Sequence, residues 1–367
     1  MRLTKTGDII CGVSFFVVWK DEACLELDEA ATRDLLRRVV NETGENCVLV
    51  EGSEGEIHTT TRRERNRILE IAVQVAGGRV PVFGCVHASS LREQIETALE
   101  AKRLGASGLF WHIPLPLVLH SSAAWDEFVV DNLKRLDAEV DLPIIVRGSP
   151  EAGLSVDVIS PHTFRKAAKE VPNFCGWKVI SLGNMSAWYR CQEIMKDTQV
   201  RLLSAGSSEP TLLVTHMLGW AEGNLSGGSN FTAKWDLDVM RLARQGKFNE
   251  AKELADQLMP IYNAVYGIEP GIQRAGFIPR YKLFGWLAGL IPTPYMRYPW
   301  LPRPKEEVEK LCRAIERSQL FPKDVIRDAR HRVDTYDPDR ILKAHQNYIK
   351  RGECVASVES AVAAYDA

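Results

Sequence analysis

Short apolar runs alternate with stretches of helical spacing through most of this chain, and this alternation is the feature that most limits its fold. Eight runs read as buried strands, at residues 9–18, 47–50, 80–84, 108–111, 143–146, 175–180, 200–204 and 223–226. Helical periodicity follows most of them, at residues 25–40, 61–75, 91–104, 125–136 and from about 161 onward. Eight such units in series suit a closed parallel (β/α)8 barrel, a TIM barrel, better than an open doubly wound sheet. An open sheet that binds a dinucleotide usually carries a Gly-x-Gly-x-x-Gly loop after its first strand. No such loop follows the first run, so this sequence gives little support to a dinucleotide-binding fold.

Composition argues against some partners and against a metal site. The chain has 367 residues, is 45% hydrophobic and carries a formal net charge of -2. A near-neutral balance argues against nucleic acid or an anionic membrane as the main partner. No apolar stretch approaches the roughly 18 residues of a membrane span, and the first residues lack an apolar signal core, so we expect a cytoplasmic protein. The eight cysteines form no C-x-x-C pair and have no histidine at ligand spacing, which favours reduced thiols and no metal site.

One lysine stands inside an apolar run, Phe174-Cys175-Gly176-Trp177-Lys178-Val179-Ile180. A lysine in a buried strand must desolvate its ammonium group or lose the proton, and a neutral lysine is the nucleophile of Schiff-base enzymes. The alternative is ordinary: a lysine at the end of a strand often packs its stem and reaches solvent with its charge.

The active site of such a barrel lies in the loops after the strands, where several reactive residues of this chain fall. At or directly after the ends of the second to eighth strands, respectively, lie Gly52-Ser53-Glu54-Gly55-Glu56, His87, His112, Arg147, Lys178, Gly206-Ser207-Ser208 and Ser226-Gly227-Gly228. Glycine-rich loops allow backbone N–H groups to approach a carboxylate closely. This convergence favours Lys178 as a nucleophile, with Gly52, Ser53, Gly206, Ser207 and Ser226 as candidates for substrate binding.

Four motifs carry a family resemblance: Gly-Ser-Glu-Gly-Glu at 52–56, Gly-Arg-Val-Pro-Val at 78–82, Gly-Trp-Lys at 176–178 and Gly-Asn-Leu-Ser at 223–226. They resemble the dihydrodipicolinate synthase / N-acetylneuraminate lyase family of class I pyruvate-type aldolases, over residues 7–320. The resemblance implies a barrel core at 1–230, a last barrel helix and helical region at 231–321, and a charged tail at 322–367 outside the family. It also implies a homo-oligomer, dimer or tetramer, and a covalent imine between Lys178 and a 2-oxo acid, without a cofactor.

The departures from the family pattern concern the groups around this lysine. Arg147 stands where the family has a proton-relaying tyrosine, and a guanidinium cannot give up its proton near neutral pH. Ser53 keeps one hydroxyl of the family's threonine pair, but Glu54 replaces the other. The family's Pro-Tyr-Tyr corresponds to residues 114–116, and the arginine that the synthases use falls within residues 151–153, where no arginine occurs. Lysine biosynthesis is therefore not expected.

Three roles are open for Arg147: lowering the pKa of Lys178, binding the substrate carboxylate, or pairing with Glu54. Glu54 is a candidate for proton transfer, and His87 and His112 are further acid–base candidates that also suit packing roles. Glu56 matches a family glutamate that we expect to hold the loop.

The sequence thus predicts a lyase that makes or breaks a carbon–carbon or carbon–oxygen bond next to an imine. An aromatic substrate, as in hydratase-aldolases, would suit a pocket lined by Trp111, Trp177, Phe15 and Phe16. The alternative is a catalytically altered barrel that serves as a binding, regulatory or scaffold protein through residues 322–367.

Overall fold

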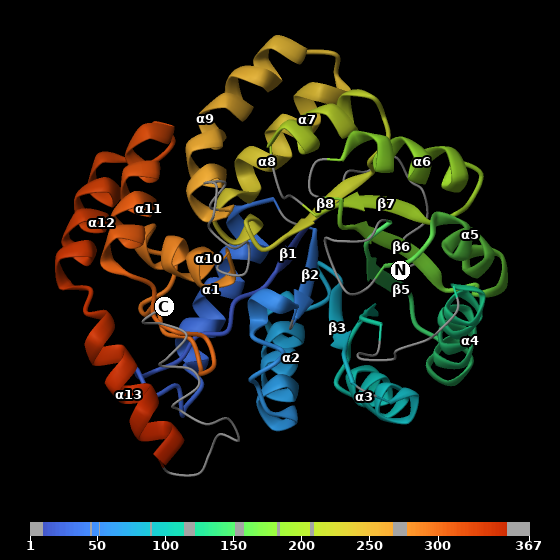
Figure 1. Cartoon of the computed structure of the whole chain (residues 1–367), viewed down its shortest axis with the longest axis horizontal. Coiled ribbons are helices and arrows are strands. Elements are labelled where there is room, and N and C mark those ends of the chain that lie inside the picture. Colours follow the sequence, from blue (N-terminus) through green and yellow to red (C-terminus); the bar gives the residue numbers. More distant parts are fainter. Residues whose placement is uncertain are drawn as a thin grey trace.

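The protein is a barrel of eight parallel strands wrapped in helices (Figure 1). The computed structural model describes residues 10–44, 46–50, 52–88, 90–113, 122–150, 158–181, 184–205, 209–266 and 277–350. The strands are β1 (Ile10–Ser14), β2 (Cys47–Val50), β3 (Val82–Val86), β4 (Gly108–Trp111), β5 (Ile144–Gly148), β6 (Phe174–Val179), β7 (Arg201–Ser204) and β8 (Gly223–Ser226). They pair in chain order, and β1 pairs with both β2 and β8, which closes the barrel. The predicted (β/α)8 fold is confirmed.

A helix follows each strand and covers the outside of the barrel. These helices are α1 (Glu29–Glu42), α2 (Arg62–Ala76), α3 (Leu91–Arg103), α4 (Ser122–Val140), α5 (Pro161–Glu170), α6 (Met185–Met195), α7 (Glu209–Met217) and α8 (Ser229–Arg244). Their starts follow from local sequence. Thr61 and Glu64 form a reciprocal capping box at α2, and Ser90 accepts a hydrogen bond from the Glu93 N–H at α3. Pro161 takes the first position of α5, where its missing N–H costs no helical hydrogen bond.

Five strands have boundaries that differ from the sequence prediction, and β3 and β1 differ most. Strand β3 begins at Val82, because Pro81 has no N–H to donate to the sheet, and it continues to Val86. His87 therefore follows the strand directly. Strand β1 ends at Ser14, although the apolar run continues to Val18, because the chain there leaves the barrel and packs among helices.

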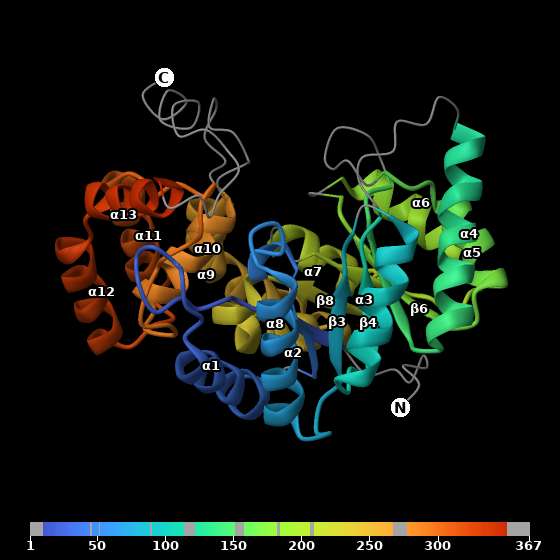
Figure 2. The ribbon, with the colours of Figure 1, turned by 90° about the horizontal axis from the view of Figure 1, so that it is seen from below.

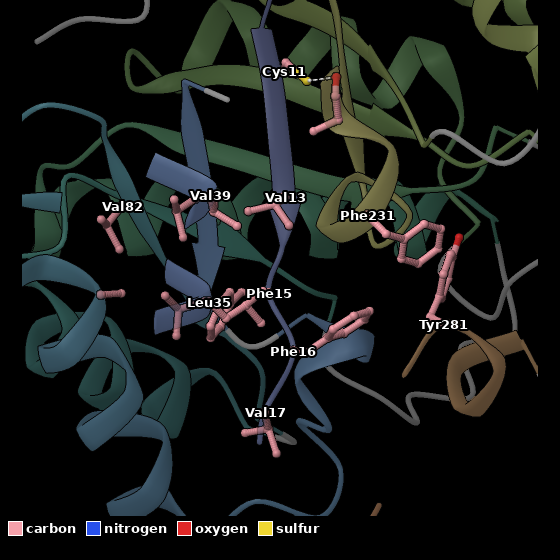
Figure 3. Close-up of a cluster of buried hydrophobic side chains, with 14 of the residues drawn as sticks. Cys11, Val13, Phe15, Phe16, Val17, Leu35, Val39, Val82, Phe231 and Tyr281 are labelled. Atoms are coloured by element: carbon pink, nitrogen blue, oxygen red, sulfur yellow. Dashed lines mark hydrogen bonds between the residues drawn. The ribbon is translucent and has the colours of Figure 1, made fainter. Parts of the chain in front are cut away.

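Successive side chains along each strand point to opposite faces, so the hydrophobic core has one part inside the barrel and one part outside it. A small cluster fills the barrel and consists of Ile10, Cys47, Leu49, Ile57, Phe83, Cys85, Phe110, Ile145, Leu203 and Leu225. The larger cluster lies between the strands and the surrounding helices. Figure 3 shows part of this outer layer, with Val13 of β1 near Val39 of α1, and Phe16 beyond the strand on the side of Phe231 and Tyr281.

Among the described residues, five further helices follow the barrel: α9 (Phe248–Tyr266), α10 (Phe277–Leu287), α11 (Lys305–Ser318), α12 (Lys323–Thr335) and α13 (Pro338–Lys350). Helix α10 is buried from Ile278 to its end, including Arg280 and Lys282. Helices α12 and α13 lie at the edge of the molecule opposite α4 and α5, as both views show (Figures 1 and 2). None of the helices that the structure describes is both long and apolar enough to cross a membrane.

Candidate active site

The strand period places the reactive residues in one layer at the carboxyl end of the barrel. Cys85, Phe110 and Ile145 belong to the interior cluster, and the side chains two residues further along are His87, His112 and Arg147. Lys178 is opposite Arg147 in the register of β5 and β6, and opposite the interior residue Leu203 in that of β6 and β7. The layer of side chains above the interior cluster is therefore made of polar and basic residues.

Lys178 is buried in this layer, with 5% of its surface exposed. Its Nζ lies 5.7 Å from the centroid of the Phe110 ring. Within the part of the chain that the structure describes, no carboxylate lies within ion-pair distance of this Nζ. Burial lowers the pKa of Lys178, the Glu54 carboxylate acts in the opposite direction, and the Arg147 cation lowers the pKa further. The site thus favours the free amine that nucleophilic attack requires.

Glu54 is buried and fixed in the short turn η1 (Ser53–Gly55) after β2. Ser14 Oγ donates a 2.6 Å hydrogen bond to Glu54 Oε2. Two glycines leave room for it: a Cβ at Gly52 would lie 2.2 Å from Ser14 Oγ, and a Cβ at Gly227 would lie 2.3 Å from Glu54 Cγ. Asn230 Nδ2 donates to the carbonyl oxygens of Ser14, at 2.7 Å, and of Gly227, at 2.8 Å. The three loops that enclose this carboxylate are therefore joined to one another.

Arg147 shares the electrostatic environment of both groups. Burial lowers its pKa, and the carboxylate of Glu54 counteracts that shift. Glu54, Arg147 and Lys178 therefore influence one another at the mouth of the barrel, where the carboxyl ends of the strands converge.

Glu56 belongs to the frame of the site. It is fully buried and accepts hydrogen bonds from Trp19 Nε1 at 3.1 Å, from Lys282 Nζ at 2.5 Å and from the backbone N–H of Arg297 at 2.9 Å. These partners come from three distant parts of the chain. This network fits the expected role of Glu56 in holding the loop that carries Glu54.

The remaining predicted binding residues differ in position. Ser53 is the first residue of η1 and is partly exposed. Ser226 pairs with Val13, whose side chain lies in the outer layer, and Ser226 Oγ accepts a hydrogen bond from the Gly228 N–H at 3.0 Å. The Ser226 side chain thus orders the turn into α8 instead of facing the barrel interior. Gly206 and Ser207 lie outside the described residues, as do residues 114–116 and 151–153.

The proposed aromatic lining is wrong. Trp111, Trp177, Phe15 and Phe16 are fully buried in the outer layer between strands and helices. The reason is strand alternation: Trp177 precedes the inward Lys178 by one residue, so it points the opposite way. The aromatic ring that does lie beside the lysine is Phe110.

Sequence reasoning missed Ser14 and Phe110. Both could have been found by counting in steps of two along the strands, because Phe110 precedes His112 by two residues and Ser14 follows Gly12 by two. The Cβ position of Gly12 lies 2.2 Å from Leu225 of the interior cluster, which identifies the inward face of β1.

A closed (β/α)8 barrel with a buried lysine at the carboxyl end of β6 has the architecture of an imine-forming lyase. The comparison with known families is more specific: the chain belongs to the Dihydrodipicolinate synthetase family, whose profile matches residues 13–318. Members of this family are class I aldolase-type lyases that act on pyruvate-type substrates.

Individual relatives agree with this assignment. The chain is 27% identical over 297 residues to the 4-hydroxy-tetrahydrodipicolinate synthase of Sulfurihydrogenibium sp., covering 80% of this chain and 95% of the relative. It is 29% identical over 305 residues to a synthase of the same name from Thermus thermophilus, covering 81% and 93%. The solved dihydrodipicolinate synthase of Aquifex aeolicus superposes with a TM-score of 0.72 at 26% identity, covering 86% of this chain and 99% of that one. The N-acetylneuraminate lyase of Fusobacterium nucleatum shares the fold, with a TM-score of 0.71 at 18% identity, covering 86% and 100%.

Proposed function

We propose that this protein is a Schiff-base lyase in which Lys178 forms an imine with a 2-oxo acid of the pyruvate type. The observation that carries the proposal is the buried Lys178 amine, with Arg147 beside it in the barrel register and no described carboxylate at ion-pair distance. Membership of a family of class I aldolase-type lyases supports the same chemistry.

The reaction follows from the chemistry of a buried amine. The free amine of Lys178 attacks the C2 carbonyl carbon, and the resulting carbinolamine loses water to give a protonated imine. This imine withdraws electrons from C3, so a bond to C3 or to the next carbon can form or break. The product is released when water hydrolyses the imine and returns the lysine. The overall reaction is the formation or cleavage of a carbon–carbon or carbon–oxygen bond next to the former carbonyl group.

Arg147 and Glu54 have complementary roles in this proposal. The cation of Arg147 favours the free amine before attack and attracts the carboxylate of the arriving substrate. Glu54, held by Ser14, is a proton acceptor and donor for the carbinolamine steps. Its charge disfavours a second carboxylate at the same place, which supports a substrate class different from that of the synthases.

Reduction of the imine tests the proposal directly. The protein is incubated with pyruvate and then with sodium borohydride, and intact mass and peptide mapping locate the adduct. We expect a single stable adduct on Lys178, its absence in Lys178→Ala and Lys178→Met, and its retention in Lys166→Ala, a control at an exposed lysine of α5. The proposal fails if wild-type protein gives no adduct with any 2-oxo acid tried, or if the adduct survives in Lys178→Ala.

A further inference from the structure

Three histidines form a row of rings at the mouth of the barrel, and the row runs from the surface to the interior. His58 is exposed, His87 is partly buried, and His112 is only 6% exposed. The ring centroids of His58 and His87 are 5.2 Å apart, and those of His87 and His112 are 5.6 Å apart. The rings of both pairs are nearly perpendicular, with interplanar angles of 84° and 85°.

The rings are direct neighbours, and each pair has an edge-to-face arrangement. No hydrogen bond joins two of these rings among the described contacts, so proton transfer between them requires a ring rotation or a bridging water.

Two ring nitrogens in the row have no hydrogen-bond partner among the described residues. They are His87 Nδ1 and His112 Nε2, and both atoms are buried. Buried polar atoms nearly always have a partner, from the protein, from water or from a ligand. These two nitrogens are therefore available to a water molecule or to a bound substrate.

The inner end of the row lies beside the lysine. The Phe110 ring is 4.9 Å from the His112 ring, measured between centroids, and 5.7 Å from Lys178 Nζ. His112 and Lys178 therefore contact the same aromatic ring. Lys178 and Arg147 both act electrostatically on His112, so the imidazole lies in the same charged environment as the lysine.

A buried glutamine fixes the backbone of two of the three histidine-bearing segments. Gln94 Nε2, from α3, donates hydrogen bonds to the carbonyl oxygens of Ala88 at 3.1 Å and His112 at 3.2 Å. Its Oε1 accepts a 2.8 Å hydrogen bond from Trp111 Nε1. The loops after β3 and β4 are thus tied to one helix, which keeps His87 and His112 in register.

The environment keeps these imidazoles neutral near pH 7. Burial lowers the pKa of His87 to about 4, and His58, Arg65 and Arg147 add to that shift. Burial also holds the pKa of His112 well below its usual range, again with help from Arg147. A neutral imidazole has one nitrogen free to accept a proton. The same burial weakens each imidazole as a base, so His112 can act as a base only if its proton passes on toward solvent.

We infer that His112 is the acid–base group that moves protons at C3 of the imine, and that His87 and His58 carry those protons between His112 and solvent. This inference rests on the proposed imine at Lys178. It gives the barrel a proton relay beside Arg147, whose guanidinium group cannot exchange a proton near neutral pH.

The step is a simple proton transfer. His112 removes a proton from C3 of the protonated imine, the C–H electron pair forms the C2–C3 double bond, and the electrons of the C2–N double bond return to nitrogen as a lone pair. The product is a neutral enamine with an imidazolium at His112. That proton passes to His87, then to His58 and to water, and the reverse sequence reprotonates C3.

Exchange of the C3 hydrogens of pyruvate in D₂O measures this step, and borohydride trapping measures imine formation separately. We expect His112→Gln to lower the exchange rate by roughly 10²–10⁴-fold while the Lys178 adduct still forms. His87→Ala should lower exchange by about tenfold and regain it with added imidazole, since a free base replaces the missing link. His331→Gln, at an exposed histidine of α12, is the control and should leave both measurements unchanged.

The outcomes separate the two proposals. Normal exchange in both His112→Gln and His87→Ala, with the adduct intact, overturns the relay and leaves the imine proposal standing. Absence of the adduct in wild-type protein overturns both. If His112→Gln loses the adduct as well, adduct formation is measured in His112→Asn too. The thermal unfolding midpoint of each variant then shows whether the protein is folded. A folded variant without an adduct contradicts a role confined to C3.

Discussion

Two groups of opposite charge act on Lys178, so its protonation depends on neighbours that shift its pKa in opposite directions. The Arg147 cation lowers its pKa and the Glu54 carboxylate raises it, in addition to the lowering that burial causes. Each neighbour can be neutralised without changing the lysine itself. The pH dependence of imine formation then reports the sign of each contribution.

We predict that Arg147→Gln moves the pH profile of imine formation to higher pH, and that Glu54→Gln moves it to lower pH. Without the cation, the ammonium form of Lys178 is less disfavoured, its pKa rises, and the free amine is lost at a higher pH than in wild type. Without the carboxylate the pKa falls, and the free amine persists to lower pH. The initial rate of borohydride-trapped adduct is measured across the pH range in which the protein stays folded.

Arg241→Gln, at an exposed residue of α8, is the control for the loss of one positive charge. Its profile should coincide with that of wild type. A lower maximal rate in Arg147→Gln at an unchanged pH midpoint would contradict the electrostatic role and leave substrate binding as the function of Arg147.

At the scale of single residues, the sequence predicts those groups whose chemistry is unusual for their position. Lys178 is recognisable because a charge in an apolar run must be neutralised or paired. Ser14 and Phe110 are ordinary strand residues, and only the inward face of their strands gives them a place in the site. His58 follows η1 in a turn with no periodicity, so its approach to His87 requires the folded chain.

At the scale of elements, one buried ion pair connects the loop that carries Glu54 to the helices outside the barrel. Glu56 and Lys282 are separated by 226 positions in sequence, and their side chains are 0% and 1% exposed. Arg297 reinforces the contact: its guanidinium group binds Glu64 of α2 and lies 4.0 Å from the Trp19 ring centroid. The loop that carries Glu54 is thus held by α10 and by the segment after it.

We predict that Lys282→Met destabilises the protein by about 3–5 kcal/mol, because it leaves the Glu56 carboxylate buried without its cation. The free energy of unfolding in urea measures the loss. Imine formation should also slow, since the loop with Glu54 becomes less rigid. Lys252→Ala, which breaks an exposed pair with Asp256 on α9, should cost no more than about 0.5 kcal/mol. Equal losses in the two variants would contradict a structural role for the buried pair.

Strand boundaries can be predicted from local sequence, whereas contacts between distant elements cannot. Runs such as Cys47–Val50, Gly108–Trp111 and Gly223–Ser226 form strands with the predicted boundaries, because short apolar segments between polar breaks have one plausible place in a barrel. The pairing of Glu56 with Lys282 has no local signal. Lys282 lies in a helix that is buried on all sides, where a sequence pattern does not reveal the partner of a charge.

At the scale of the whole molecule, α12 and α13 extend the chain beyond residue 318, where the family match ends. They are packed against the helical region, with Tyr336 Oη donating a 2.9 Å hydrogen bond to the Arg303 carbonyl oxygen and Arg340 Nε 2.6 Å from Glu22 Oε1. Both views show these helices on the side of the molecule away from α4, α5 and β6 (Figures 1 and 2). The described part of the extension therefore supplies stability to the helical region and contributes no residue to the Lys178 site.

Deletion of residues 322–367 separates catalysis from the alternative of a binding or scaffold protein. Val333, Tyr336 and Ile341 are 7%, 6% and 5% exposed, and burial of such side chains contributes about 1.5–3 kcal/mol each. We therefore expect the truncated protein to lose at least about 3 kcal/mol of unfolding free energy in urea and still form the Lys178 adduct at roughly half the wild-type rate or faster.

Arg340→Ala in the full chain, which removes only a partly exposed ion pair, should cost less than about 1 kcal/mol. Loss of the adduct from a truncated protein that is still folded would show that residues 322–367 complete the active site, since the barrel mouth itself is unchanged by the deletion.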